Sequence, residues 1–370
     1  MILPEVMTFL SMNKRIACII ENLGSGGAER QISGLAVLLH KQGYEVEVWY
    51  YIDSVFYLAF LQENGVTVRF LADASNYRHR FSVLRKQIAR YKPHDVISYS
   101  VSPSVISCLL KAFGAKFNLI VSERNTTQTL TGRDRLRFFL YRWANVIVPN
   151  SNSQASFIKQ HFPYLSSKIT VITNFVDTEV FSPAKTRIPS RDIINVVCVG
   201  RLAPQKNILR LMQAIGQVKA DGYSIRIDWF GRDFGDSYSC EIHRLVSDLS
   251  LEDNVVFHRT SNSIQTEYCN ADVFCLPSLY EGFPNVLCEA MSCGLPVLCS
   301  RVCDNPSIVN DTENGYLFDP LSIGDMVNTI EKFLNLPSRQ REEMGRKSRE
   351  IAVVLFSKER FLNQYIQLLS

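Results

Sequence analysis

Two acidic residues, Glu281 and Glu289, stand eight positions apart around the turn at residues 282–285. That spacing does not make them neighbours on one helix, because facing side chains on a helix are three or four residues apart. Pro284 suits the first turn of a helix, and Gly282 permits a close approach of the backbone. We therefore expect Glu281 in a loop and Glu289 inside the helix that follows. A carboxylate accepts two hydrogen bonds, which suits the neighbouring hydroxyls of a sugar or a ribose.

The backbone N–H groups of Asn285, Val286 and Leu287 begin this predicted helix, where N–H groups have no partner within the helix. We expect them to face a cleft between the two carboxylates and to bind phosphate, so that hydroxyls are held at each end of the site. For Glu289 the alternative is a partner of the helix dipole, worth about 0.3–1 kcal/mol. Its helix neighbours are apolar, however, and a buried carboxylate needs a partner.

Two cations, Arg201 and Lys206, lie on either side of Pro204 directly after a predicted strand. At the carboxyl end of a strand they can clamp a diphosphate, Arg201 as a planar fork and Lys206 as a point charge. The alternative is that both are solvated surface charges.

A glycine-rich turn containing Gly26 and Gly27 follows the first predicted strand and opens a helix. Such a turn lets backbone N–H groups and the helix dipole approach a phosphate, and the alternative is a flexible turn without a ligand. Glu29 stands where the third glycine of a GxGxxG motif would be, which disfavours a dinucleotide dehydrogenase.

Short runs rich in β-branched residues alternate with amphipathic helical segments, which is typical of a parallel, doubly wound sheet. A polar stretch with two prolines at residues 182–192 interrupts the alternation and predicts a linker. The predicted strands are 15–20, 45–50, 66–70, 95–99, 117–122, 146–149 and 169–172 before the linker, and 195–200, 225–230, 254–257, 273–276, 296–300 and 315–318 after it. The predicted helices include 28–42, 82–91 and 151–161, and a long helical region, 339–369, closes the chain.

The predicted fold class is therefore α/β, with two Rossmann-like doubly wound domains and a ligand cleft between them. A chain of 370 residues is too long for one ordinary core. We place the N-terminal domain at residues 12–184 and the C-terminal domain at residues 190–349.

The composition bounds the environment of the protein. With 46% hydrophobic and 21% charged residues it is that of a soluble globular protein, and no apolar run approaches the ~18 residues of a membrane span. The N-terminus lacks the pattern of a signal peptide, and Met12 resembles a second start, so we expect residues 1–11 to be dispensable. The ten cysteines form no CxxC pair and mostly sit in apolar surroundings, which indicates free thiols in the cytoplasm and no metal site.

The two halves of the chain differ in charge. Residues 1–185 carry 21 Lys and Arg against 13 Asp and Glu, and the remainder carries 19 against 23. In the basic half, four arginines interleave with large apolar residues, a pattern typical of a helix at a membrane surface. The arginines are Arg133, Arg135, Arg137 and Arg142, and the apolar residues are Leu136, Phe138, Phe139, Leu140, Tyr141 and Trp143. The alternative is that the aromatic residues are core and the arginines are solvated.

Taken together, these stretches resemble the GT-B glycosyltransferases of the family-4 type, the retaining glycosyl transferases group 1. The resemblance covers nearly the whole chain. It rests on the glycine-rich first loop, on G-R-L-x-x-x-K at residues 200–206, on E-G-F-P-x-x-x-x-E at residues 281–289, and on N-G-Y-L-F at residues 314–318.

The resemblance implies a hexosyltransferase that moves a hexose or N-acetylhexosamine from a nucleotide diphosphate sugar with retention of configuration. Arg201 and Lys206 would hold the diphosphate, Glu281 the donor sugar and Glu289 the nucleotide ribose. It favours UDP as the nucleotide, requires no other cofactor, and leads us to expect that residues 350–370 cross back to the N-terminal domain. No Asp-x-Asp pair is present to bridge a divalent cation to the diphosphate, so we expect catalysis without a metal.

One departure from the family concerns the acceptor side. Many members carry a histidine after the fifth strand of the first domain, whereas this chain has Ser122-Glu123-Arg124-Asn125, like members that extend lipid-linked oligosaccharides. Either Glu123 or Arg124 faces the acceptor, or the two form a structural ion pair with each other. We expect a glycan or lipid-diphosphate acceptor, a peripheral position on the inner, anionic face of the membrane, and no nucleic-acid partner.

Two other functions stay open. A non-catalytic nucleotide-sugar binding protein is disfavoured by the complete set of Arg201, Lys206, Glu281 and Glu289. A GT-B sugar-nucleotide 2-epimerase is disfavoured by the basic first half, since its small product needs no charged docking face.

Overall fold

The computed structural model describes residues 14–71, 76–124, 126–184, 193–261 and 263–370. The chain forms two compact units, one ending at Phe175 but including Lys358–Ser370, and the other spanning Val176–Ser357. We call these unit 1 and unit 2. The divisions fall nine residues before the predicted end of the first domain at residue 184 and eight after residue 350. Most of the predicted linker, residues 1–11, which we expected to be dispensable, and Asn125 lie outside the described residues.

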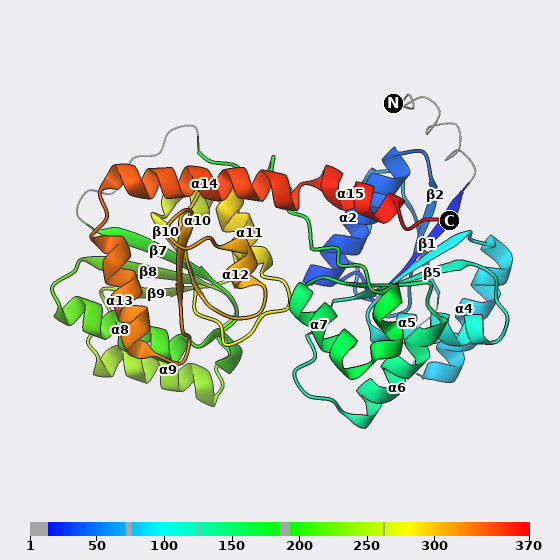
Figure 1. Cartoon of the computed structure of the whole chain (residues 1–370), viewed down its shortest axis with the longest axis horizontal. Helices are drawn as coiled ribbons and strands as arrows, with labels where there is room; N and C mark the ends of the chain where they lie inside the picture. The colour runs from blue at the N-terminus through cyan, green and yellow to red at the C-terminus, as the bar shows by residue number, and fades with distance from the viewer. Residues whose placement is uncertain (1–13, 72–75, 125, 185–192, 262) are drawn as a thin grey trace. The chain divides into compact units, whose positions relative to one another are not determined.

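Unit 1 is built on a six-stranded parallel sheet with the order β3-β2-β1-β4-β5-β6 (Figure 1). Its strands are β1 (Arg15–Ile19), β2 (Glu45–Tyr50), β3 (Thr67–Phe70), β4 (Asp95–Tyr99), β5 (Asn118–Glu123) and β6 (Val146–Pro149). The central strands β1 and β4 are buried along nearly their whole length, as expected for a parallel sheet covered by helices on both sides, whereas the edge strand β3 has no buried residue. In β1, Ile16 and Cys18 belong to one core, and Ala17 and Ile19 belong to the other.

The helices of unit 1 form one layer on each face of this sheet. They are α2 (Gly27–Lys41), α3 (Leu58–Glu63), α4 (Tyr77–Tyr91), α5 (Val101–Ala112), α6 (Gly132–Leu140) and α7 (Asn152–His161), with the 3-10 turns η1 (Tyr141–Trp143) and η2 (Pro163–Lys168). Helices α4, α5 and α6 lie side by side on one face, and α2 lies on the other. The chain's last helix, α15 (Lys358–Ile366), packs against α2, so the end of the chain returns to unit 1.

Unit 2 repeats this plan with the strand order β12-β11-β10-β7-β8-β9. Its strands are β7 (Ile194–Val199), β8 (Ile225–Phe230), β9 (Val255–His258), β10 (Val273–Leu276), β11 (Val297–Ser300) and β12 (Gly315–Phe318). Its helices are η3 (Pro204–Lys206), α8 (Ile208–Ala220), α9 (Ser237–Asp248), α10 (Ile264–Asn270), α11 (Asn285–Ser292), α12 (Asn305–Ile308), α13 (Ile323–Leu334) and α14 (Ser338–Phe356). Both sheets reverse their direction of growth between two central strands, β1 and β4 in unit 1 and β7 and β10 in unit 2.

The predicted fold class, two doubly wound α/β units, is confirmed, and two local predictions are wrong. Residues 169–172 form no strand, since only Ile169 makes an isolated bridge, to Ile147. The long closing helix is two helices, separated by the extended residue Ser357. Its halves serve different cores, since α14 packs on α11 in unit 2 and α15 packs on α2 in unit 1.

Candidate functional site

The loops that follow β7 and β10 bring two of the predicted site residues, Lys206 and Glu281, into direct contact. Strands β7 and β10 are parallel neighbours at the point where the strand order reverses, which is where ligands bind in sheets of this kind. Lys206 ends the turn after β7, and Glu281 lies in the loop after β10. The Lys206 Nζ atom is 2.6 Å from Glu281 Oε1, and the side chains are 12% and 10% exposed. The structure therefore joins a cation and a carboxylate that are 75 positions apart in the sequence.

Backbone and amide hydrogen bonds hold these two loops together. The N–H of Leu279 donates to the carbonyl of Gln205 over 2.8 Å, and the Gln205 side-chain amide donates to the carbonyl of Tyr280 over 2.9 Å. The buried Asn207 amide donates to the carbonyls of Pro277 and Pro320, so it ties the loops after β7, β10 and β12 to one another.

Asn207 and Gln205 were missed by the sequence analysis. For Asn207 only its backbone conformation had a signal, because asparagine tolerates a left-handed backbone before a helix such as α8. Its side chain makes no capping hydrogen bond, so the contacts with Pro277 and Pro320 had no sequence signal. Its φ is 56°, in the left-handed region. No sequence pattern marks Gln205, whose role depends on the distant Tyr280.

Gly200 lets the Lys206 side chain lie against the backbone at the end of β7. A Cβ atom at Gly200 would stand 2.8 Å from Lys206 Cε, and one at Gly231 would stand 2.0 Å from the Gly200 carbonyl oxygen. The Trp229 indole N–H donates to the same oxygen over 2.6 Å. The two glycines therefore allow a close approach that fixes the path of the Lys206 stem.

Arg201 shares this loop but not the ion pair. Its side chain is exposed, and within the described residues the structure records no hydrogen bond or ion pair for it. The predicted clamp of Arg201 and Lys206 on a diphosphate is untested, and in this structure only Lys206 is fixed in place.

Helix α11 begins one residue later than predicted, with Pro284 as its cap rather than in its first turn. The N–H of Asn285 donates to the Phe283 carbonyl over 2.9 Å, and the N–H of Leu287 donates to the Pro284 carbonyl over 3.0 Å. The expectation of free N–H groups is therefore wrong for Asn285 and Leu287, because a tight turn at Pro284 engages them. A phosphate-binding role for these residues and Val286 stays a prediction.

Glu289 lies inside α11 as predicted, but it is only 4% exposed. The buried Tyr268 hydroxyl lies 3.4 Å from its Oε2 atom, a long hydrogen bond. The carboxylate thus has a partner from α10 within its own unit, and its predicted contact with a ribose is untested.

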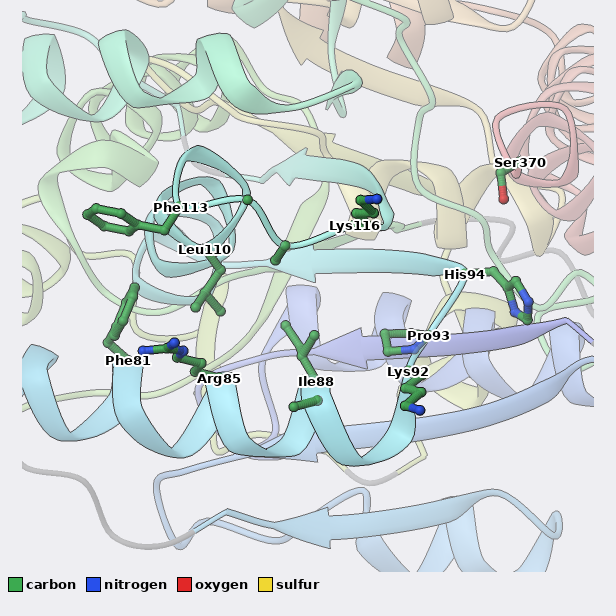
Figure 2. Close-up of a pocket in the computed structure, with 13 residues that line it drawn as sticks. Phe81, Arg85, Ile88, Lys92, Pro93, His94, Leu110, Phe113, Lys116 and Ser370 are labelled. Carbon is green, nitrogen blue, oxygen red and sulfur yellow. The ribbon is translucent and has the colours of Figure 1, made fainter.

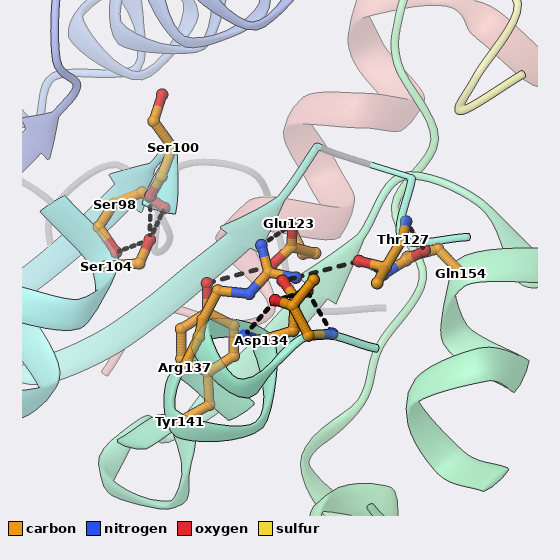
Figure 3. Close-up of polar contacts among 10 residues, drawn as sticks. Ser98, Ser100, Ser104, Glu123, Thr127, Asp134, Arg137, Tyr141 and Gln154 are labelled. Carbon is orange, nitrogen blue, oxygen red and sulfur yellow. Dashed lines mark hydrogen bonds and ion pairs between the residues drawn. The ribbon is translucent and has the colours of Figure 1, made fainter. Parts of the chain in front are cut away.

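The cation that pairs with Glu123 is Arg137 (Figure 3), not its neighbour Arg124, so the predicted ion pair between Glu123 and Arg124 is wrong. Glu123 ends β5 and points toward α6, where its Oε1 lies 3.5 Å from Arg137 Nη1 and its Oε2 accepts the Tyr141 hydroxyl over 3.0 Å. Burial raises the pKa of Tyr141 well above its ordinary value, as does the Glu123 charge, so this hydroxyl stays protonated and donates. Because Glu123 is only 2% exposed, this geometry favours a role in positioning Arg137 and Tyr141 over direct contact with an acceptor.

Arg124 points to the other face of the sheet, because successive residues of an extended chain alternate in direction. Its guanidinium donates to the hydroxyls of Tyr99 over 3.0 Å and Tyr365 over 2.6 Å, and to Asn174 Oδ1 over 2.7 Å. Tyr365 lies on α15, so Arg124 holds the returning end of the chain on unit 1. This arginine is a structural anchor.

The glycine-rich loop of unit 1 is occupied by one of its own side chains. Gly26 caps α2 and Gly27 is its first residue, as predicted. A Cβ atom at Gly26 would stand 2.1 Å from Glu29 Oε2, so Glu29 folds back over the start of the helix. Burial raises the pKa of Glu29, and the nearby Glu21 does so further. A phosphate at Gly26 and Gly27 would have to displace this carboxylate.

The basic and aromatic segment divides between core and surface. Phe138, Leu140 and Tyr141 are core, and Arg137 is buried against Glu123. Arg133, Arg135, Leu136, Phe139 and Arg142 are exposed, and the Arg142 guanidinium lies 3.7 Å from the centre of the Phe139 ring. We call these five residues the α6 surface. The prediction of a basic and apolar surface therefore fits the exposed residues of the segment, and the alternative of a buried aromatic core fits Phe138 and Tyr141.

Cysteines and metal ligands add no further site. All ten cysteines are free, and burial raises the pKa of Cys18 to about 12. Within the described residues, no three His, Cys, Asp or Glu side chains come together as a metal site, and no helix is long and apolar enough to cross a bilayer.

Family models match both units of the chain. Residues 25–180 match the model described as Glycosyltransferase Family 4, and residues 181–351 match the model described as Glycosyl transferases group 1. This chain belongs to the family-4 glycosyltransferases. It is therefore an enzyme that transfers sugars, and its two units are the halves of a GT-B fold.

Relatives of this glycosyltransferase are spread over several bacteria. It is 26% identical over 309 residues to an N-acetylgalactosamine-N,N'-diacetylbacillosaminyl-diphospho-undecaprenol 4-alpha-N-acetylgalactosaminyltransferase of Campylobacter jejuni, covering 78% of this chain and 80% of that one. It is 30% identical over 185 residues to a UDP-Gal:alpha-D-GlcNAc-diphosphoundecaprenol alpha-1,3-galactosyltransferase of Escherichia coli, covering 46% and 48%. The structure of Anabaena HepE in complex with UDP and glucose matches with a TM-score of 0.82 at 19% identity, over 96% of this chain and 98% of that one, which shows the shared fold.

Proposed function

We propose that this glycosyltransferase moves a hexose or N-acetylhexosamine from a UDP-sugar, with retention of configuration and without a metal, onto a growing lipid-linked glycan. The observation that carries the proposal is the contact between Lys206 and Glu281 at the strand-order reversal of unit 2. In the proposed complex, Lys206 neutralises the departing diphosphate and Glu281 accepts hydrogen bonds from the donor sugar. Arg201 adds a second cation to the diphosphate from its exposed position on the same loop.

The proposed substrates draw support from the relatives. The names of the Campylobacter jejuni and Escherichia coli enzymes both specify an acceptor on diphospho-undecaprenol. The second name specifies UDP-Gal as the donor, and the HepE structure contains UDP. The same nucleotide and the same kind of acceptor are therefore our proposal for this chain.

A direct test combines a panel of UDP-, GDP- and ADP-sugars with a synthetic lipid-diphosphate sugar acceptor. We expect one UDP-sugar to give a product with the anomeric configuration of the donor, as measured by NMR. Nucleotide binding without any release of nucleotide would contradict catalysis, an isomerised nucleotide sugar would indicate an epimerase, and an inverted product would refute retention.

We also propose that the α6 surface docks unit 1 on an anionic membrane. The lipid-linked acceptor would be found in that membrane. Anionic lipid attracts each nearby cation by about 1 kcal/mol, and exposed apolar side chains such as Phe139 can enter the interface. Arg133→Glu with Arg135→Glu should abolish most co-sedimentation with vesicles of anionic phospholipid at low salt.

The matched control is Arg259→Glu with Arg339→Glu, which makes the same charge change at two exposed positions of unit 2. It should leave co-sedimentation nearly unchanged. An equal loss in both variants would mean that net charge, rather than the α6 surface, drives the association.

A further inference from the structure

Unit 1 contains a pocket of 1080 Å³ that has no part in the site described above (Figure 2). It lies between α4 and the end of α5. Its apolar lining comes from Phe81, Ile88, Pro93, Leu110 and Phe113, and its polar lining comes from Arg85, Lys92, His94, Lys116 and Ser370. A volume of this size is ample for a ligand of about the size of a drug or cofactor.

The pocket opens at the amino-terminal edge of the sheet. Lys92 and His94 lead directly into β4, and Lys116 lies just before β5. Glu123 and Arg124 stand at the opposite, carboxyl-terminal end of β5, the edge where substrates bind in this kind of sheet. An occupant of the pocket would therefore be neither the sugar donor nor the reacting end of the acceptor.

The apolar side of the pocket presents exposed aromatic surface. Phe113 is 78% exposed, and its ring meets the half-buried Phe81 ring edge-on at a centroid distance of 6.0 Å. Ile88 and Leu110 form the buried floor. An aliphatic chain lying on these four residues would remove apolar surface from water, which stabilises a complex in proportion to the area covered.

The polar side of the pocket is cationic. Lys92, Lys116 and Arg85 are exposed, and within the described residues none of their side chains has a recorded ion pair. His94 Nδ1 accepts the Arg15 backbone N–H over 3.0 Å, so a neutral His94 carries its hydrogen on Nε2 and can donate from there. Among the lining residues that the structure describes, none is an Asp or a Glu. A carboxylate next to the lining, the buried Asp95, accepts the N–H of Ser370 over 2.8 Å and its hydroxyl over 3.1 Å.

Figure 2 separates the two kinds of lining along the pocket. Phe81 and Phe113 lie at one end, and Lys92, Lys116 and His94 lie toward the other. Arg85 projects beside Phe81, where its aliphatic stem adds to the apolar lining while its charge stays in water. Apolar rings therefore lie at one end of the pocket, and hydrogen-bond donors stand around the other end.

We infer that this pocket binds a lipid phosphate of the bilayer, with the aliphatic chain on Phe81, Ile88, Leu110 and Phe113 and the phosphate held by Lys92, Lys116 and His94. Phosphate suits these donors because two ammonium groups and an imidazole N–H can each take one of its oxygens. The inference stands apart from the proposed catalytic function, since it concerns a different edge of a different unit from Lys206 and Glu281.

The test uses the full chain with dodecyl phosphate below its micelle concentration, measured by titration calorimetry. We expect one saturable site per chain. Lys92→Glu with Lys116→Glu should weaken binding at least about tenfold, because each charge-assisted contact is worth about that factor or more. Phe113→Ser changes a largely exposed side chain, so the fold is retained, and it should weaken binding severalfold.

The matched control lies on the same helix. Lys86→Glu with Arg90→Glu makes the same charge change at exposed positions of α4 outside the pocket lining, so it should leave the affinity within about twofold. An equal loss in this control would reduce the binding to general electrostatics and overturn the inference. If inorganic phosphate bound equally tightly, the pocket would be a site for anions and not for a lipid phosphate. If dodecyl maltoside bound equally tightly, the pocket would recognise only the aliphatic chain.

The absence of saturable binding by the full chain would also overturn the inference, since the pocket would then be closed to lipid. UDP separates this site from the proposed donor site. Saturating UDP should leave the affinity for dodecyl phosphate unchanged, and displacement by UDP would place the probe in the donor site instead. Failure of sugar transfer would leave this result intact, and failure of lipid binding would leave sugar transfer intact.

Discussion

The contact between Lys206 and Glu281 makes a prediction that separates stability from catalysis. Because the two side chains are about nine-tenths buried and 2.6 Å apart, each compensates the charge of the other. Glu281→Gln leaves an ammonium group without its counter-charge, and Lys206→Met leaves a carboxylate in the same position. Both single changes should therefore destabilise unit 2, and the double change should be milder than their sum.

The size of the effect follows from the burial. Removing one partner of a fully buried ion pair costs about 3–5 kcal/mol. In Glu281→Gln the new side-chain amide would still accept one hydrogen bond, so the loss of a charged hydrogen bond, about 1.5–3 kcal/mol, is the better guide for that change. In a unit of this size, that free energy lowers the melting temperature by roughly 3–12 °C. The two single changes should couple by at least about 1 kcal/mol in the double variant.

The free energy of unfolding of unit 2 should be measured for the unchanged protein, the two single variants and the double variant. Hydrogen exchange of peptides from β7 and β10 reports it for unit 2 alone, which matters because the two units need not unfold together. The control is the same pair of changes, Arg346→Met and Glu350→Gln, at an exposed ion pair on α14 of the same unit, for which we expect coupling below about 1 kcal/mol. Additive effects at Lys206 and Glu281 would refute the contact. Normal turnover by a destabilised Glu281→Gln variant would refute its proposed role toward the donor sugar.

Three further predictions concern other parts of the chain. Glu289→Gln should weaken UDP binding about tenfold or more if Glu289 holds the ribose, whereas Tyr268→Phe should not, and equal losses in calorimetry would make Glu289 only the partner of Tyr268. Arg124→Gln should destabilise unit 1 by at least about 3 kcal/mol in chemical unfolding followed by hydrogen exchange, against less than about 0.5 kcal/mol for the exposed Arg133→Gln. EDTA should leave sugar transfer unchanged, since Lys206 is proposed to supply the charge that a metal would otherwise supply, and rescue of a lost activity by Mn²⁺ would contradict this.

Most of the fold was predictable because parallel strands buried on both faces leave continuous runs of β-branched and aromatic residues. The strand errors come from the same rule. Residues 169–172 have the composition of a strand and lie along β6, where the N–H groups of Thr170 and Ile172 donate to the carbonyls of Ile147 and Pro149. They form only one isolated bridge, at Ile169, and composition could not reveal that the sheet ends at β6. The break at Ser357 could not be predicted, because the segments on both sides of it have helical sequence patterns. The helix ends there because α14 packs in unit 2 and the chain from Lys358 onward packs in unit 1.

The candidate site was predictable in its residue types but not in its contacts. Both Lys206 and Glu281 carry motif signals, yet their pairing depends on β7 and β10 being neighbours, which the order of elements along the chain does not state. The opposite directions of Glu123 and Arg124 follow from the two-residue period of a strand and were open to prediction. The partner of Glu123 was not, since Arg137 lies on a helix that could have presented any of its arginines.

The ion pair also bears on how a donor could be held without first breaking a stable contact. The Lys206 ammonium has three N–H donors, and the pair with Glu281 Oε1 uses one of them. Two donors remain for oxygens of a diphosphate, and Glu281 Oε2 remains for a sugar hydroxyl. In the proposed complex, the leaving group and the transferred sugar therefore lie on either side of a contact that already exists. Binding of the donor then needs little reorganisation of this contact, because the charged groups are in place before the reaction begins.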